Sequence, residues 1–188
     1  MKHESQGKIR ALIIGARAVV FDRRAATELF SKGFYGKPFG VRKPRPEENV
    51  NTPLELSLLE ALYLCEKGVL ELIKDNKVIT CEELSVYASM LSPLFNEHYI
   101  VYKDLRERGY IVRSGMKFGA DFAIYEKGPG YEHAPYLVTV MRLTDYIDPI
   151  EIVSAGRVSH SVRKRLIVAL VDPLNKIIRY IMFKWVKM

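Results

Sequence analysis

The sequence predicts an α+β fold in two parts: a helix-rich N-terminal domain with a small sheet, followed by an α/β domain with a mixed or antiparallel sheet. Helical patterns with capping residues dominate the first half, and apolar runs of strand type dominate after Gly109. The chain has 188 residues, 48% hydrophobic and 27% charged, which is enough for two packed cores. We therefore expect domains at residues 1–92 and 93–188.

The first elements are two short strands and a helix. Residues 9–21 contain the apolar runs ALII and AVVF around Gly15, which predict the strands. The following DRRAATELFSKGF is rich in good helix formers, and Gly33 weakens its end. Residues 35–51 are then interrupted by glycines and prolines and carry four cations, so we expect an exposed basic loop.

Three further helices are predicted before the second domain becomes strand-rich. Thr52 and Pro53, with Glu55 completing a capping box, predict a helix over LELSLLEALYLCEK. An extended piece with a turn follows, and Thr80-x-x-Glu83 is a second capping box. The third helix begins after Ser92-Pro93 and ends at Gly109.

The second half predicts strands at YIVR, KFGADFAIY and PYLVTVMRL. A helical stretch then covers about residues 150–164. The chain closes with RLIVALV and KIIRYIMFKWV, joined by a turn at residues 172–175.

Composition limits the classes of function. The formal net charge of +7 favours a polyanionic partner, chiefly nucleic acid, although a generic basic surface would give the same number. The N-terminus is polar and no apolar run is long enough to span a bilayer, so we expect a cytoplasmic protein. Cys65 and Cys81 are expected to pack as small hydrophobic residues; a disulfide is the alternative, which a reducing compartment disfavours.

The sequence has none of the common metal or nucleotide motifs. It contains no His-Glu-x-x-His, no Cys-x-x-Cys, no acidic cluster with metal-ligand spacing and no P-loop. We therefore expect no metal and no cofactor, and a metal-dependent nuclease is disfavoured.

The segment FGADFAIYEKGPGYEHAPYLV predicts a hairpin that brings Tyr125 and His133 to the same end of two strands. A ribonuclease without a metal needs a base, an acid and a cation, and these two side chains with a lysine can supply them. Each also has a structural interpretation: a tyrosine that packs its ring, a solvated histidine, and Lys164 in a solvated basic face.

The runs DLRERGY, KFGADF, EHAPYLV and HSVRK, in this order, resemble the catalytic domain of the archaeal tRNA-splicing endonuclease family, and LSLLEALYLCEKG is similar to its N-terminal domain. The resemblance implies an enzyme that cleaves precursor tRNA at bulge-helix-bulge elements without a metal and leaves 2′,3′-cyclic phosphate and 5′-hydroxyl ends. It also implies that residues 93–188 form the catalytic domain and that residues 1–92 serve assembly.

The matching catalytic positions are Tyr125 as general base, His133 as general acid and Lys164 as the cation on the scissile phosphate. Histidine has a reference pKa near 6.5, which suits an acid at neutral pH, whereas tyrosine, near 10, is a poor base without a nearby cation. The alternative is a non-catalytic RNA-binding or structural subunit of the same complex.

The resemblance also implies RNA contacts. Arg157 and Arg179 match the two arginines that hold a bulged base, although Arg179 also fits an outward-facing strand residue. The insertion at residues 35–51 is similar to that of the crenarchaeal form, and Lys43 is its candidate phosphate contact. A disordered insertion is the alternative.

Assembly is predicted from the C-terminal strand, which is long and apolar and would aggregate as an exposed edge. The resemblance implies self-association through this strand and an α2β2 heterotetramer with a structural paralogue. Asp172 matches the family's acidic docking loop, although here it is a single acid followed by Pro173.

Overall fold

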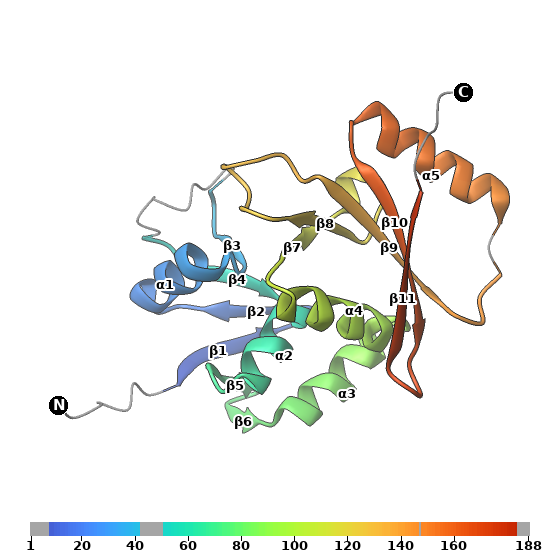
Figure 1. The fold of residues 1–188 in the computed structure, drawn as a ribbon. Helices are drawn as coiled ribbons and strands as arrows, with labels where there is room; N and C mark the ends of the chain where they lie inside the picture. Colours follow the sequence, from blue (N-terminus) through green and yellow to red (C-terminus); the bar gives the residue numbers. More distant parts are fainter. Residues whose placement is uncertain (1–7, 42–50, 147, 184–188) are drawn as a thin grey trace. The chain divides into compact units, whose positions relative to one another are not determined.

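The computed structural model describes residues 8–41, 51–146 and 148–183 of the chain (Figure 1). It divides into two compact units, Met1–Phe95 and Asn96–Met188. Each unit combines helices with one mixed sheet, which confirms the predicted α+β class. In the described part of the chain, no helix is both long and apolar enough to cross a membrane.

Among its described residues, the first unit holds a six-stranded sheet in the order β3-β4-β2-β1-β5-β6. β1 pairs in parallel with β5, and the other neighbours are antiparallel. The sheet is larger than the small one expected, because β3 and β4 come from segments predicted as loop and helix. The strands are β1 (Ile9–Ile14), β2 (Arg17–Val20), β3 (Lys37–Pro38), β4 (Leu54–Ser57), β5 (Leu70–Lys74) and β6 (Lys77–Ile79).

The helix predicted from Thr52 and Pro53 starts later than expected. Leu54 and Leu56 are fully buried and pair with β2, so this segment is a strand whose apolar side chains alternate into the core. The capping box lies at Ser57 and Glu60 instead: Ser57 Oγ accepts from Glu60 N at 3.2 Å, and Glu60 Oε2 accepts from Ser57 N at 2.8 Å. Helix α2 (Leu58–Glu66) therefore begins after it.

The predicted loop of residues 35–51 begins as structure. Gly36 has φ +67, and a Cβ there would lie 2.6 Å from the Glu55 carbonyl oxygen, so glycine lets β3 approach β4. Residues 42–50, including Lys43, lie outside the described residues. The helix before this loop is α1 (Arg23–Gly33), whose N-cap Asp22 accepts from Ala25 N at 2.9 Å.

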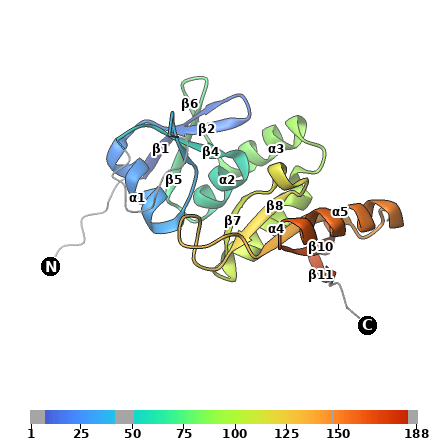
Figure 2. The ribbon, with the colours of Figure 1, turned by 90° about the horizontal axis from the view of Figure 1, so that it is seen from above.

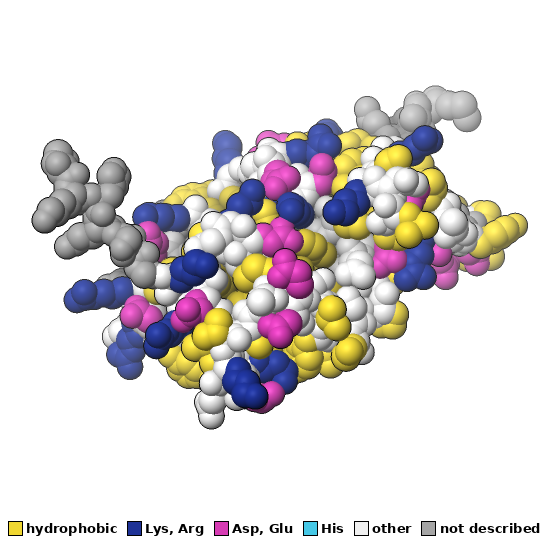
Figure 3. Space-filling model, turned by 90° about the horizontal axis from the view of Figure 1, so that it is seen from below, with side chains coloured by type: hydrophobic (Ala, Val, Ile, Leu, Met, Phe, Trp, Pro, Cys, Tyr) yellow, Lys and Arg dark blue, Asp and Glu magenta, His cyan; other side chains and the backbone are white. Residues whose placement is uncertain are grey.

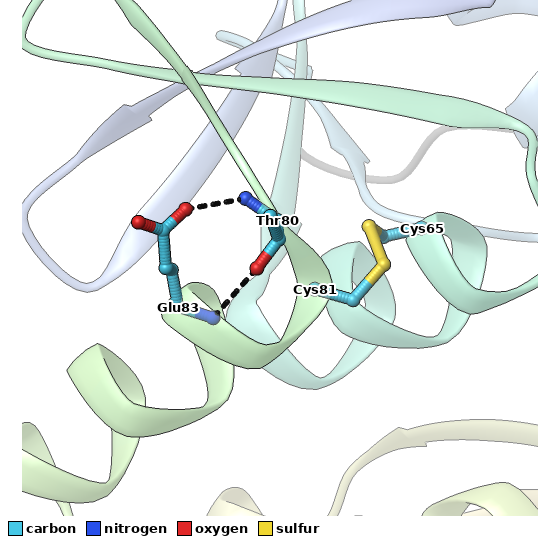
Figure 4. Close-up of a disulfide and its surroundings, with 4 residues drawn as sticks. All are labelled: Cys65, Thr80, Cys81 and Glu83. Atoms are coloured by element: carbon cyan, nitrogen blue, oxygen red, sulfur yellow. Dashed lines mark hydrogen bonds between the residues drawn. A yellow bond between two sulfur atoms is a disulfide. The ribbon is translucent and has the colours of Figure 1, made fainter.

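Cys65 and Cys81 form a disulfide, with an S–S distance of 2.09 Å, so the expectation that they pack as separate thiols was wrong (Figure 4). Cys65 lies near the end of α2, and Cys81 is the first residue of α3 (Cys81–Leu91). The β5–β6 hairpin returns the chain, which brings the two Cα atoms to 5.9 Å, within disulfide range. The capping box at Thr80 and Glu83, drawn in the same figure, fixes the start of α3 as predicted.

The second unit contains a five-stranded sheet in the order β11-β10-β9-β8-β7 among its described residues. β9 and β10 are parallel and joined through α5, and the other neighbours are antiparallel. The predicted C-terminal strand is observed to Phe183, and its remainder lies outside the described residues. The elements are α4 (Phe95–Glu107), β7 (Ile111–Ser114), the 3₁₀ turn η1 (Met116–Phe118), β8 (Phe122–Tyr125), β9 (Tyr136–Arg142), α5 (Pro149–Ser161), β10 (Arg165–Asp172) and β11 (Ile177–Phe183).

The two faces of this sheet are covered by different helices. On one face α4 packs its Tyr102 ring 6.2 Å from the Phe122 ring, and Tyr180 of β11 donates to Asp104 of α4 at 2.7 Å. On the other face, α5 packs along β10 (Figure 2).

The molecular surface drawn in Figure 3 carries basic and acidic side chains mixed with apolar ones, and they are not separated into one charged patch.

Candidate active site

The candidate site is built on the hairpin of β8 and β9. The strands pair antiparallel, with Ile124 opposite Tyr136, so Tyr125 is the last residue of β8 at the loop end of the hairpin. His133 lies in the connecting loop, residues 126–135, and is exposed. Among the described residues His133 makes no hydrogen bond or ion pair, so its imidazole is open to a substrate.

The loop is longer than the tight turn suggested by Gly-Pro-Gly, and Glu132 organises it. Glu132 Oε1 accepts from the backbone N–H groups of Glu126 and Lys127 at 2.6 Å each, and from Gly128 at 3.4 Å. These hydrogen bonds, led by that from Lys127, hold the pKa of Glu132 below its usual value. Glu132, next to His133, thus connects the end of the loop to its first residues through hydrogen bonds.

Lys164 reaches the same loop from a distant part of the sequence. Its ammonium Nζ donates to the Ala134 carbonyl at 2.7 Å, directly after His133. The next backbone group, Arg165 N, donates to Pro135 O at 3.0 Å, where β10 starts to pair with β9. Lys164 is therefore held against the loop by both side-chain and backbone hydrogen bonds.

Phe118 of η1 links the tyrosine and the lysine. Tyr125, Phe118 and Val162 pack against a small buried cluster of Ala123, Ala134 and Leu137. Lys164 Nζ lies 5.0 Å from the centroid of the Phe118 ring, within cation–π range. The Phe118 ring and the buried cluster thus form one packed surface that Tyr125 and Lys164 both contact.

Strand register places Tyr125 on the same face of the sheet as the start of β10, which follows Lys164. Opposite residues share a face and every second residue returns to it, so Tyr125, Leu137 and Leu166 lie on the same side. Leu166 is two residues from Lys164, and Leu170, opposite Arg179, is on that side too. Tyr180, which bonds α4, lies on the other side.

The pKa shifts in the site have opposite consequences for the two residues. Burial raises the pKa of Tyr125, and the charge of Glu132 adds to this, while Arg113 opposes it. Burial lowers the pKa of Lys164, and the nearby charge of Lys117 lowers it further. Tyr125 is therefore a weaker acid than a free tyrosine, and Lys164 releases its proton more readily than a free lysine.

The GADF part of the KFGADF motif is structural. Asp121 Oδ2 accepts from Val140 N at 2.7 Å, and Oδ1 lies 3.2 Å from His98 Nε2 of α4. A Cβ at Gly115, which precedes η1, would lie 2.7 Å from the Ala120 carbonyl oxygen. The motif therefore fixes the backbone around Phe118.

The predicted RNA and docking residues are spread over the same unit. Arg157 is exposed on α5 and Arg179 is exposed on β11, and both of these elements contact β10. Asp172 caps its own turn, accepting from the side chain of Asn175 at 2.8 Å and from two backbone groups, which lowers its pKa. Within the described ranges, no three His, Cys, Asp or Glu side chains are arranged to hold a metal ion.

Sequence reasoning missed Phe118, Lys117 and Glu132. The KFGADF motif contains the first two, but the pattern does not reveal that the phenylalanine ring lies beneath Lys164. Glu132 had no distinguishing signal, because one glutamate near a turn is ordinary. The role of Glu132 depends on the direction of the backbone N–H groups of residues 126–128, which the sequence does not reveal.

Comparison with known proteins covers both units. A family model described as tRNA intron endonuclease, catalytic C-terminal domain, matches residues 95–180, and one described as tRNA intron endonuclease, N-terminal domain, matches residues 9–85. A protein named tRNA-splicing endonuclease from Hyperthermus butylicus is 56% identical over 180 residues, which is 95% of this chain and 99% of the relative. Proteins of the same name from Saccharolobus islandicus and Saccharolobus solfataricus are 49% identical over 181 residues, 96% of this chain and 100% of each relative.

These matches extend over nearly the whole chain and confirm the resemblance found in the motifs. The tyrosine, histidine and lysine lie in the segment that the catalytic-domain model covers. The chain therefore belongs to the tRNA intron endonuclease family and carries both its N-terminal and its catalytic domain.

Proposed function

We propose that this protein is an endonuclease that removes introns from precursor tRNA, cutting at bulge-helix-bulge elements by metal-independent attack of a ribose 2′-OH. Family membership supports the substrate. The observation that carries the chemistry is the hydrogen bond from Lys164 to Ala134, which brings a cation to the loop that holds His133 and follows Tyr125.

In the proposed step the 2′-oxygen forms a bond to phosphorus while the bond from phosphorus to the 5′-oxygen breaks. Tyr125 takes the proton of the 2′-OH, and His133 gives a proton to the departing 5′-oxygen. Lys164 stabilises the extra negative charge on the phosphate oxygens. The products are a 2′,3′-cyclic phosphate and a 5′-hydroxyl, and the three residues match the base, acid and cation that this reaction needs.

The base is the most demanding role, because burial raises the pKa of Tyr125 and keeps it protonated. The proton can leave only if a positive charge comes close to the phenolate in the bound complex. The charge of Arg113 already lowers the pKa of Tyr125 in part. The ammonium group of Lys164 lies over the Phe118 ring, which packs against the same buried cluster as Tyr125.

RNA recognition is assigned to Arg157 and Arg179, whose exposed guanidinium groups can stack on an unpaired base of the bulge. Lys43, in the insertion at residues 35–51, supplies a phosphate contact. The active assembly is an α2β2 heterotetramer with a structural paralogue, with β11 as the self-associating strand and Asp172 in the docking turn.

The test uses a bulge-helix-bulge RNA, with and without a single 2′-deoxy nucleotide at the cleavage site, and the chain alone or mixed with the paralogue. We expect cleavage of the all-ribose RNA in EDTA and no cleavage of the deoxy RNA, because the nucleophile is then missing. Cleavage of the deoxy RNA, or strict dependence on Mg²⁺, overturns the proposal. Binding without cleavage under every condition favours a non-catalytic RNA-binding subunit instead.

A further inference from the structure

Lys117 lies beside the candidate lysine, over the same aromatic ring. Its Nζ is 4.8 Å from the centroid of Phe118, and Lys164 Nζ is 5.0 Å from the same centroid. The face of a benzene ring attracts cations, so Phe118 can hold both ammonium groups. Two like charges therefore lie near one ring, and the charge of Lys117 lowers the pKa of Lys164, a repulsion that an anion bound between them would relieve.

No carboxylate neutralises this pair in the described part of the chain. Lys164 donates to a neutral backbone carbonyl, and its pKa is lowered by burial and by Lys117 rather than raised by an acid. Lys117 is exposed, and within the described ranges its one attractive contact is with the Phe118 ring. Paired ammonium groups without a counter-ion are suited to an oxyanion such as a phosphate.

The backbone that carries Lys117 is fixed, although its side chain is exposed. Gly119 N–H donates to the Met116 carbonyl at 3.0 Å and closes η1 with φ +70, a conformation that glycine adopts easily. On the other side of η1, a side chain at Gly115 would collide with the Ala120 carbonyl. The turn therefore fixes the backbone position from which the Lys117 side chain reaches the Phe118 ring.

We propose that Lys117 is a second catalytic cation, which with Lys164 holds the scissile phosphodiester between two ammonium groups. Each lysine contacts one of the non-bridging oxygens, whose negative charge grows as the 2′-oxygen attacks phosphorus. No bond to either lysine forms or breaks. This inference rests on the proposed function, because it assigns a second contact to the same phosphate.

The experiment measures single-turnover cleavage of the bulge-helix-bulge RNA and, separately, the Kd for its uncleavable 2′-deoxy form. The variants are Lys117→Gln, Lys117→Arg and, as a matched control, Lys77→Gln. Lys77 is an exposed lysine on β6 of the other unit, so its loss changes the net charge equally. We expect Lys117→Gln to lower the cleavage rate about tenfold, less than a buried oxyanion donor because water screens an exposed lysine. Its Kd changes little.

The other variants separate charge from structure. Lys117→Arg keeps the charge and recovers most of the rate, and Lys77→Gln matches the wild type. In the free protein, Lys117→Gln raises the pKa of Lys164, followed by NMR of its ε-methylene group, because one of the two causes that lower it is gone. If Lys117 has a purely structural role, Lys117→Arg does not recover the cleavage rate and the pKa of Lys164 does not change in Lys117→Gln.

Two results overturn the inference while leaving the proposed function intact. One is a wild-type cleavage rate for Lys117→Gln. The other is a loss confined to Kd, with a shallower salt dependence and an unchanged rate at saturating protein, which makes Lys117 a contact to a neighbouring phosphate. If the wild type itself cleaves the deoxy RNA, the proposed function fails and this inference fails with it.

Discussion

At the scale of single residues, the most informative side chain is one with no chemical role of its own. Glu132 accepts three backbone hydrogen bonds from the start of the loop that contains His133. A carboxylate bound by several N–H groups is a strong local constraint, because leaving those donors unpaired costs free energy. Glu132 therefore sets where the neighbouring histidine lies relative to Tyr125.

We predict that Glu132→Ala lowers the cleavage rate by about tenfold to a hundredfold, the scale at which a small misplacement of a reacting group acts. Glu132→Gln loses less, because its carbonyl oxygen still accepts from the loop. The measurement is single-turnover cleavage beside the Kd for the uncleavable RNA, which should stay close to that of the wild type.

The control is Glu126→Gln, in the same loop, whose carboxylate, among the residues that the structure describes, accepts only a long 3.4 Å hydrogen bond from the Tyr136 hydroxyl. It removes the same charge without releasing the turn amides. Equal rates for Glu132→Ala and the wild type contradict the positioning role, and equal losses in both glutamate variants assign the effect to charge alone.

The three candidate catalytic residues could be chosen from sequence because their motifs match a family in order and spacing. Their support could not, because Glu132, Phe118 and the Ala134 carbonyl act through hydrogen-bond direction and ring position. Such contacts depend on the path of the loop and leave no periodic signal. The difficulty with Tyr125 as a base was visible in its reference pKa, and the structure adds the cause, burial against the Ala123 cluster.

At the scale of elements, the disulfide holds the N-terminal unit together. It joins the end of α2 to the start of α3 across a sequence separation of 16 residues, and the β5–β6 hairpin lies between the two cysteines. A cross-link of this span restricts the unfolded chain more than the folded one.

We predict that replacing Cys65 and Cys81 together by serine lowers the free energy of unfolding by about 3 kcal/mol, the chain-entropy value for a loop of this length. Thermal unfolding of the oxidised wild type, the reduced wild type and the double variant checks this. Reduction should bring the wild type to the midpoint of the variant. Identical midpoints in all three samples mean that the cross-link does not constrain the unfolded state.

The elements that sequence predicted well had strong local signals, and the errors came from pairing at a distance. The capping box of Thr80 and Glu83 and the turn at Asp75 and Asn76 are local, and both are present. Thr52 and Glu55 had an equally good capping pattern, but pairing of residues 54–57 with β2 on one side and β3 on the other made that segment a strand. The same lack of long-range information hid the approach of Cys65 to Cys81.

At the scale of the whole molecule, β11 is the element that we expect to pair with another chain. It pairs only with β10 among the described strands, so its other edge has unpaired backbone groups. Its exposed side chains include Ile177, Ile181, Met182 and Phe183, each at least 37% accessible. An apolar edge strand of this length aggregates unless another strand or surface covers it.

The hydrogen bond from Tyr180 to Asp104 makes this edge a fixed surface. Asp104 also accepts hydrogen bonds from two nitrogens of Arg108, at 2.7 Å and 3.1 Å. The carboxylate that accepts from Tyr180 is therefore fixed in place by Arg108. β11 therefore meets a partner with its backbone already ordered, which reduces the entropy lost on association. Arg179, on the opposite face, is fixed by the same strand.

We predict that Ile181→Lys weakens assembly, because a charge on an edge strand opposes pairing with another strand. Light scattering should give a mass above the 21.6 kDa of a single chain for the wild type, alone or with the proposed paralogue, and a mass nearer to one chain for the variant. The matched control is Val78→Lys on β6, an edge strand of the other sheet, where an apolar side chain is 66% accessible. If both lysine variants assemble like the wild type, β11 is not the interface. If both dissociate, added charge rather than the position of β11 is the cause. If Ile181→Lys alone dissociates and also stops cleaving RNA, the active site depends on assembly through this strand.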